Sequence, residues 1–324
     1  MLPRRGVPPT TAPDEEKLMA TRKVLAIPGT DGTVTEVPYF EIVGAKPGPH
    51  FTIIAGIHGA EYSSIAAARK FVAEVNAAEV TGRITVMPIV NILAFWARAP
   101  FVIPVDYQNL NRAFPGNPDG SFTDVYAFHI FEKIIRGSDY LLDMHAGDIP
   151  EALEPFTIFE ESAVEEKALS MAKAYGIKHI VRQKAAGLVV SGSTSVAASA
   201  IGIPAIIAES GENGILDPAA VELHLMGLRN LARTLGVLLG APSTSAEHIL
   251  YEGWNWLRAE RAGWWQPAHA PGTSVSAEEL LGTLGEPWGE EFLEIKAPQN
   301  GTILFQTSSP AVSKDGILVG LALR

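Results

Sequence analysis

The chain has 324 residues, of which 47% are apolar and 19% charged, and its formal net charge is −11. This composition excludes disorder on a large scale, which needs low hydrophobicity together with high net charge, and the length suits two domains or one large one. The acidic balance argues against a nucleic-acid binder, because such proteins carry a basic stripe that displaces counterions from phosphates. The chain has no cysteine, which excludes disulfides, thiolate nucleophiles and cysteine-ligated zinc.

The first 20 residues contain four prolines, which suggests a loosely held arm. Arginines at positions 4 and 5 are not followed by an apolar run, so this segment is not a signal peptide. No stretch approaches the roughly 18 uninterrupted apolar residues of a membrane span. We therefore expect a cytoplasmic protein that acts on a small molecule, without nucleic acid or membrane as partner. Assembly into a homo-oligomer is left open.

From residue 21 to 243 the chain alternates short apolar runs with segments of helical periodicity. Strands are expected at 23–27, 33–43, 51–55, 83–90, 139–144, 157–159, 179–181 and 203–208, and helices at 60–75, 124–135, 164–175 and 218–239. Several runs are continuously apolar, as in strands that are buried on both faces. The alternation predicts an α/β domain, with a mixed and largely parallel sheet flanked by helices.

The pattern changes around residues 240–246, where an Ala-Pro-Ser-Thr-Ser segment is typical of a linker. Residues 247–324 have little helical periodicity, and short strands alternate there with turns that contain glycine and proline. This predicts a small all-β module of acceptable size for a domain. The expected organisation is an arm at 1–20, an α/β domain at 21–243 and a β-rich module at 247–324.

The segment Gly-Ile-His-Gly-Ala-Glu at residues 56–61 follows a predicted buried strand directly. At a bend between strand and helix, His58 and Glu61 can point at one centre. Imidazole nitrogen and carboxylate oxygen are standard zinc ligands, and a catalytic zinc needs three protein ligands and one open position. The alternative is that His58 caps the helix and Glu61 is a first-turn acid favoured by the helix dipole.

A second histidine, His145, ends the predicted strand at 139–144. Asp143 lies two residues earlier and therefore on the same face of the strand. Its carboxylate could accept a hydrogen bond from the ring of His145 and fix the tautomer of a metal-binding imidazole. The alternative is an ordinary core histidine at the end of a strand.

Glu209 stands where another continuously apolar strand opens into a glycine-rich turn. At the rim of an apolar sheet its pKa should be raised, because desolvation disfavours the charged form, and this suits a general base that works near neutral pH. The alternative is a loop carboxylate without a special role.

The three strand ends are more informative together than singly. Ligands of open α/β sheets bind outside the carboxyl ends of the strands, and His58, His145 and Glu209 each lie at such an end. If their strands are parallel neighbours, the side chains converge on one edge. Two imidazoles, one carboxylate ligand and a spare carboxylate form the set that metal-assisted hydrolysis requires.

The long connection before the helix predicted at 124–135 contains Asn111 and Arg112. Connections of this length are usually functional or disordered. Arg112 offers a planar fork that can bind a carboxylate through two hydrogen bonds, and Asn111 can add a donor. The alternative is a surface arginine in a turn.

Four strings resemble those of the succinylglutamate desuccinylase/aspartoacylase family, in the same order. They are Gly-Ile-His-Gly-Ala-Glu at 56–61, Asn-Arg-Ala-Phe-Pro-Gly at 111–116, Asp-Met-His at 143–145 and Ala-Glu-Ser-Gly at 208–211. The family is related in fold to the zinc carboxypeptidases, and the resemblance covers roughly residues 20–324. It implies one zinc ion per chain bound by His58, Glu61 and His145, with Glu209 activating water and with Asn111 and Arg112 holding the carboxylate of the substrate.

Two positions depart from the family pattern. Family members carry an arginine upstream of the Asn-Arg pair that polarises the scissile carbonyl, and Arg98 is the nearest candidate, at an unusual spacing. Many members have two glycines shortly after the second histidine, and here the corresponding residues are Gly147 and Asp148. Asp148 could favour a cationic substrate or merely cap the next turn.

The sequence therefore predicts a zinc-dependent amidohydrolase that cleaves the amide bond of a small N-acyl amino acid or a related N-acylated amine. Water is activated by zinc together with Glu209, and Glu209 returns the proton to the leaving amine. Two alternatives are a zinc carboxypeptidase acting on peptides and a non-catalytic protein that binds a carboxylate ligand. An intact base argues against the second alternative, because a binding protein does not need one.

Overall fold

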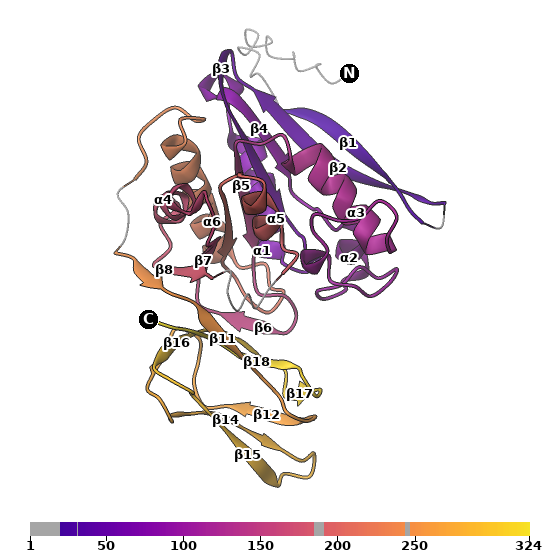
Figure 1. Ribbon diagram of the computed structural model, residues 1–324. Helices are drawn as coiled ribbons and strands as arrows, with labels where there is room; N and C mark the ends of the chain where they lie inside the picture. Colours follow the sequence, from indigo (N-terminus) through magenta and orange to yellow (C-terminus); the bar gives the residue numbers. More distant parts are fainter. Residues whose placement is uncertain (1–19, 31, 185–190, 244–246) are drawn as a thin grey trace, which may run out of the picture.

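The computed structural model describes residues 20–30, 32–184, 191–243 and 247–324, and Figure 1 shows an α/β body with a β-rich region attached below it. All but the last residue of the predicted arm, and residues 244–246 of the predicted linker, lie outside the described residues. Within the described ranges, no helix is both long enough and apolar enough to cross a membrane.

The body is built on a mixed sheet of nine strands, in the spatial order β1-β2-β4-β3-β5-β9-β7-β8-β10. In chain order these strands are β1 Thr21–Pro28, β2 Val34–Val43, β3 Lys46–Ala55, β4 Thr81–Met87, β5 Tyr140–His145, β7 Phe156–Glu160, β8 His179–Gln183, β9 Ala205–Glu209 and β10 Ile249–Tyr251. All eight strands expected in the α/β region are present. The continuous apolar runs belong to central strands that are covered on both faces, as residues 51–55 of β3 are.

Helices cover both faces of the sheet (Figure 1). One hydrophobic cluster packs α1 (Tyr62–Glu74), α4 (Glu165–Tyr175) and α6 (Pro218–Thr234) against it. A second cluster packs α2 (Ile92–Ala97), α3 (Phe122–Ile130) and α5 (Thr194–Ala200) against the opposite side. The remaining helical turns are η1 (Ala77–Glu79), η2 (Leu110–Arg112) and η3 (Phe131–Ile135), which continues α3.

Helix α6 is shorter than the sequence predicted, because it ends at Thr234 and not at 239. Gly236 follows with φ of +71°, the left-handed conformation that commonly terminates helices. The apolar residues beyond it, Val237 and Leu238, are buried against the body without being helical. The apolar periodicity continued past the end of the helix, so the helix boundary predicted from it lay five residues too far along the chain.

The three strands that carry the candidate site lie side by side. Strand β5 pairs in parallel with β3 on one side and with β9 on the other. Their carboxyl ends therefore meet at one edge of the sheet, which was the condition for the predicted convergence. The sheet is mixed, since β7 runs antiparallel to β9.

The C-terminal region contains two antiparallel sheets. One holds β11 (Trp254–Arg258), β18 (Ile317–Ala322), β16 (Gly301–Thr307) and β13 (Ser274–Val275), and the other holds β15 (Glu291–Lys296), β14 (Leu280–Gly285), β12 (Gly263–Pro267) and β17 (Ala311–Val312). A cluster around Trp265 and Leu318 forms its core. The all-β character expected for this region is therefore present.

This module is joined closely to the body. Strand β6 (Glu151–Leu153), which comes from the α/β part of the chain, pairs with β16. Strand β10 belongs to the nine-stranded sheet, although the sequence assigned its residues to the module. A shared hydrophobic cluster includes Ile158 and Ile207 from the large sheet and Trp254 and Phe305 from the module. The module thus forms one wall at the edge of the sheet.

Candidate active site

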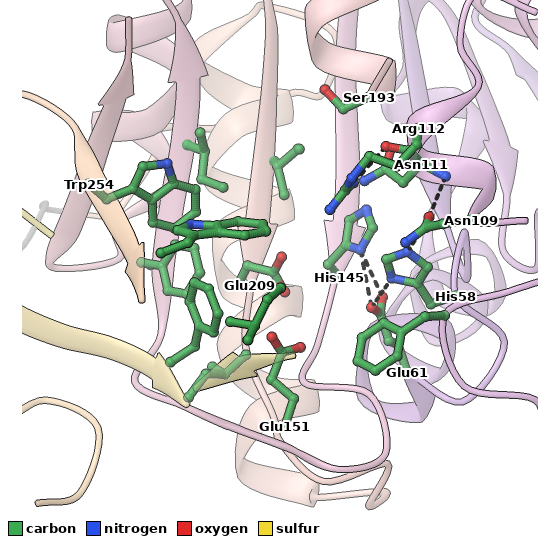
Figure 2. Close-up of a pocket in the computed structure, with 18 of the residues that line it drawn as sticks. His58, Glu61, Asn109, Asn111, Arg112, His145, Glu151, Ser193, Glu209 and Trp254 are labelled. Carbon is green, nitrogen blue, oxygen red and sulfur yellow. Dashed lines mark hydrogen bonds and ion pairs between the residues drawn. The ribbon is translucent and has the colours of Figure 1, made fainter. Parts of the chain in front are cut away.

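A cavity of about 290 Å³ opens at the carboxyl ends of β3, β5 and β9, between the body and the module. Figure 2 shows the candidate metal ligands on one side and aromatic side chains on the other. Its lining residues include His58, Glu61, Asn111, Arg112, His145 and Glu209 from the predicted site and Trp254, Trp256 and Phe305 from the module. The structure thus brings six of the eight predicted site residues to one cavity.

His58, Glu61 and His145 form a compact cluster in which one ligand atom from each lies within 4.8 Å of the others. His58 Nδ1 lies 2.6 Å from Glu61 Oε1, and His145 Nδ1 lies 3.0 Å from Glu61 Oε2. All three residues are buried. Both imidazoles thus present the same nitrogen, Nδ1, to the carboxylate.

The other ring nitrogen of each histidine faces a second acceptor. His58 Nε2 lies 3.1 Å from Asn109 Oδ1, and His145 Nε2 lies 3.1 Å from Asp143 Oδ2. If each Nε2 carries the proton, each Nδ1 presents a lone pair toward Glu61, and this arrangement of acceptors needs a cation to hold it together. Such outer partners orient metal-binding histidines, and two nitrogens with one carboxylate fit a zinc ion that keeps an open position.

The electrostatics of the cluster also favour a positive charge. Burial alone would lower the pKa of His145, but the carboxylates of Asp143 and Glu61 hold that pKa well above its usual value. Burial would raise the pKa of Glu61, yet His145 and His58 lower it to about 2. The same carboxylates would favour a divalent cation at this position.

The turn between β3 and α1 places His58 and Glu61. Gly56 has φ of +67°, a conformation that a side chain would strain. A Cβ atom at Gly59 would lie 2.2 Å from the backbone nitrogen of Phe95. Glu61 is the N-cap residue of α1 but makes no side-chain capping hydrogen bond. The alternative of a helix-capping pair therefore has no support in the geometry.

Glu209 lies at the end of β9, directly opposite His145 in the parallel register. Opposed residues on neighbouring strands share a face, so both side chains project into the cavity (Figure 2). Burial raises the pKa of Glu209 well above its usual value; His145 opposes this shift, and the nearby carboxylates of Glu61 and Glu151 add to it. This environment makes Glu209 a stronger proton acceptor than an exposed carboxylate, as a general base requires.

Asn111 and Arg112 lie on η2, beside the metal cluster. Thr194 donates its backbone N–H to Asn111 Oδ1 over 3.3 Å, and Arg112 donates to the Asn111 carbonyl over 2.7 Å. Burial lowers the pKa of Arg112, nearby Arg258 lowers it further, and Glu151 opposes them. A guanidinium remains charged under such shifts, and Arg112 is the only lysine or arginine among the described lining residues.

The structure does not bring Arg98 into the cavity. This residue caps the C-terminus of α2 with φ of +53°, its side chain is exposed, and it is not among the lining residues. Nothing in its position supports a role in polarising a carbonyl. The resemblance supplied this assignment at an unusual spacing, and the short α2 directs the residue to the surface.

Asp148 also lies outside the cavity lining. Its carboxylate accepts backbone N–H groups from Ile149 over 2.6 Å and Phe101 over 2.7 Å. Burial raises its pKa to about 6, Glu61 adds to the shift, and His58 opposes it. The sequence left open whether Asp148 recognises a cationic substrate or caps a turn, and these contacts favour capping. The carboxylate of Asp148 holds the loop that carries Phe101 in place.

Sequence reasoning did not assign roles to several lining residues. One of them is Asn109, whose Oδ1 contacts His58 Nε2. Another is Glu151, whose pKa is raised to about 7 by burial, with Glu61 adding to the shift. No local pattern distinguishes Glu151 from a surface acid. For Trp254 and Trp256 the sequence did contain a signal for a shared wall of a site, because large apolar residues two apart in a strand lie on one face.

Comparison with known proteins gives a consistent result. Residues 47–235 match the model of the succinylglutamate desuccinylase/aspartoacylase catalytic domain. The chain is 29% identical over 213 residues to the N-alpha-acetyl-L-2,4-diaminobutyric acid deacetylase of Halomonas elongata, a match that spans 65% of this chain and 61% of the length of that relative.

Solved structures share the whole fold. A succinylglutamate desuccinylase/aspartoacylase from Rhodobacter sphaeroides has a TM-score of 0.82 at 23% identity, with 96% of this chain and 98% of that chain covered. A product-bound ectoine utilization protein from Ruegeria pomeroyi has a TM-score of 0.84 at 22% identity, with 98% of each chain covered. The family match extends over more than half of the chain, and the chain therefore belongs to the succinylglutamate desuccinylase/aspartoacylase family.

Proposed function

We propose that this protein is a zinc-dependent amidohydrolase that removes the acyl group from small N-acyl amino acids. The observation that carries the proposal is the cluster of His58, Glu61 and His145, with Glu209 in register beside it on one cavity wall. A zinc ion held by the three ligands would supply Lewis-acid activation of water and of the scissile carbonyl.

Glu209 has the role of the general base in this proposal. With its pKa raised by burial, it accepts a proton from the attacking water and then delivers it to the nitrogen of the leaving amine. Asp143 fixes the ring of His145, since Thr194 donates its hydroxyl to the same Asp143 oxygen that faces His145. Each group therefore has a defined orientation before substrate binds, which lowers the reorganisation that catalysis requires.

Asn111 and Arg112 hold the carboxylate of the substrate. An arginine in a desolvated cavity binds a carboxylate through two charge-assisted hydrogen bonds, and this fixes the amide relative to Glu209. The named activity of the Halomonas elongata relative, deacetylation of a small N-acetyl amino acid, supports this substrate class. The aromatic wall from the module also narrows the site, which favours a small substrate over a peptide chain.

The proposal is tested by metal analysis of the purified protein, followed by a screen of N-acetyl and N-succinyl amino acids for released amine. Dipeptides with the same C-terminal residues are assayed in parallel. We expect about one zinc per chain, turnover of the N-acyl amino acids and loss of activity with a chelator. Faster turnover of the dipeptides would favour the carboxypeptidase alternative. Absence of hydrolysis in a zinc-loaded preparation would contradict the proposal.

A further inference from the structure

The cavity extends well away from the metal cluster along one face of the large sheet. Glu209 pairs with Phe156 of β7, and Ile207 pairs with Ile158. Because opposed residues and alternate residues share a face, Glu160 lies on this face too, at the end of β7. All five residues line the cavity.

The length of this extension follows from strand geometry. Glu160 is four residues beyond Phe156, the residue opposite Glu209, and at about 3.3 Å per residue this corresponds to about 13 Å between the two glutamates along the sheet. The wall between them is apolar, with Ile158 and Ile207 on the sheet and Trp254 on the module. The cavity is therefore a channel with an acid at each end.

Glu160 is an unusual residue for the end of an apolar channel. Only 3% of it is exposed. Ser195 donates its hydroxyl to Oε1 over 2.8 Å, and Gln183 donates its amide to Oε2 over 2.9 Å. Both donors are neutral, and no cation forms an ion pair with Glu160 in the described part of the chain. Burial raises its pKa to about 7, although these two hydrogen bonds oppose the shift.

A buried carboxylate that lacks a cationic partner is costly, and a ligand that brings the charge offsets this cost. A ligand ammonium at the end of the channel would do so. The carboxylate can accept such a donor in addition to Ser195 and Gln183, because its two oxygens offer about four lone-pair sites.

The position of the carboxylate clamp indicates which half of the substrate enters the channel. The segment 192–195 links the two places: Thr194 donates its N–H to Asn111, and the adjacent Ser195 donates to Glu160. Gly192 lies against the backbone of Arg112, where an added Cβ would be 2.1 Å from the Arg112 carbonyl oxygen. If Asn111 and Arg112 hold the substrate carboxylate as proposed, the amino-acid half of the substrate lies beside this segment, and its side chain is the part that can extend toward Glu160.

We propose that Glu160 is a specificity-determining residue that binds the terminal ammonium of a long basic side chain, so that the preferred substrates are Nα-acyl derivatives of lysine-like amino acids. This inference rests on the proposed deacylase function. A side chain of four methylenes and an ammonium extends about 6 Å from Cα. A hydrogen bond of about 2.9 Å from the ammonium to Glu160, and another between the scissile nitrogen and Glu209, bring the total close to the length of the channel. The side chain of diaminobutyrate is two methylenes shorter and falls short of it.

The test compares kcat/KM of the zinc-loaded enzyme for Nα-acetyl-L-lysine, Nα-acetyl-L-norleucine and Nα-acetyl-L-2,4-diaminobutyrate. Norleucine has a similar apolar side chain without the ammonium. We expect the wild-type enzyme to prefer the lysine derivative at least tenfold over each of the others. In Glu160→Gln, which keeps the shape and can still bond Ser195 and Gln183, the preference for lysine over norleucine should fall to about one. The matched control is Glu161→Gln, an exposed neighbour that pairs with Arg182 and should leave the preference unchanged.

The outcomes separate this inference from the function on which it rests. If the wild-type enzyme hydrolyses none of the N-acyl amino acids, the proposed function fails. If it hydrolyses them without preferring lysine to norleucine, only the role of Glu160 is overturned, and this result needs no variant. A lysine preference that survives in folded Glu160→Gln, as judged by its thermal unfolding, also overturns that role.

Discussion

The guanidinium of Arg112 lies over the indole ring of Trp256, 5.8 Å from the ring centroid. Arg112 belongs to η2 of the α/β body, and Trp256 to β11 of the module. The module therefore takes part in placing the proposed carboxylate ligand. A cation held over an aromatic face contributes about 0.5–2 kcal/mol, depending on desolvation.

Replacing this ring should weaken substrate binding. We expect Trp256→Ala to raise KM for an N-acyl amino acid by about 2- to 30-fold, the factor that corresponds to that interaction energy, with a smaller change in kcat. Trp256→Phe should lie in between. Trp264→Ala, at an exposed position on the module, is the control. Equal KM values for Trp256→Ala and the wild type would show that the stack does not position Arg112.

Glu209→Gln should lower kcat by about 10²- to 10⁴-fold, the usual contribution of a positioned acid–base group. Zinc content should not change, because Glu209 is not one of the proposed ligands. Steady-state kinetics and metal analysis of the same preparation check both statements. Glu222→Gln, on the exposed side of α6, is the control. A kcat within tenfold of the wild type, with zinc bound, would exclude Glu209 as the base.

Asp143→Asn should weaken zinc binding by about 10- to 100-fold, the range expected on loss of an outer partner of a ligating histidine. The neutral amide still fits between Thr194 and His145 but no longer makes the imidazole more basic. Competition with a chromophoric chelator measures the affinity, and Glu209→Gln serves as a comparison that should retain it. Unchanged zinc affinity would mean that Asp143 only stabilises the fold.

His224 should make the protein less stable in acid. It is fully buried, and its Nε2 lies 2.9 Å from the His145 carbonyl oxygen. Burial lowers its pKa from 6.5 to about 4. Between these values the unfolded chain binds a proton that the folded protein does not, so stability decreases as pH falls from 6.5 toward 4. The full shift corresponds to about 3 kcal/mol.

Urea unfolding at pH 7.5 and pH 4.5 tests this expectation. The difference in unfolding free energy between the two pH values should be about 2–3 kcal/mol smaller in His224→Gln than in the wild type. Glu151 and Glu160, with raised pKa values, act in the opposite direction in both proteins and cancel in the comparison. An identical difference in the two proteins would remove His224 as the source.

The sequence predicted the site best where the apolar pattern of a strand also indicates where the end of that strand lies. Apolar strands that end in His58, His145 and Glu209 predicted a shared edge, because parallel strands align their carboxyl ends. Glu160 and Glu151 could not be found in this way. Glu160 follows a predicted strand as Glu209 does, but β7 runs antiparallel to β9, so its carboxyl end lies away from the shared edge. Glu151 begins the short strand β6, whose partner β16 comes from the distant module. Arg98 was expected near the scissile carbonyl from the resemblance alone, and the length of α2 decided its actual position.

The pairing of β6 with β16 makes the two parts of the chain depend on each other for stability. Removing residues 247–324 would leave the backbone groups of β6 unpaired and would uncover the apolar surface around Ile158 and Ile207. Exposed strand edges and apolar patches promote aggregation. We expect the full chain to melt in a single transition and the shortened chain to be insoluble, so the active site and the module form one cooperative unit.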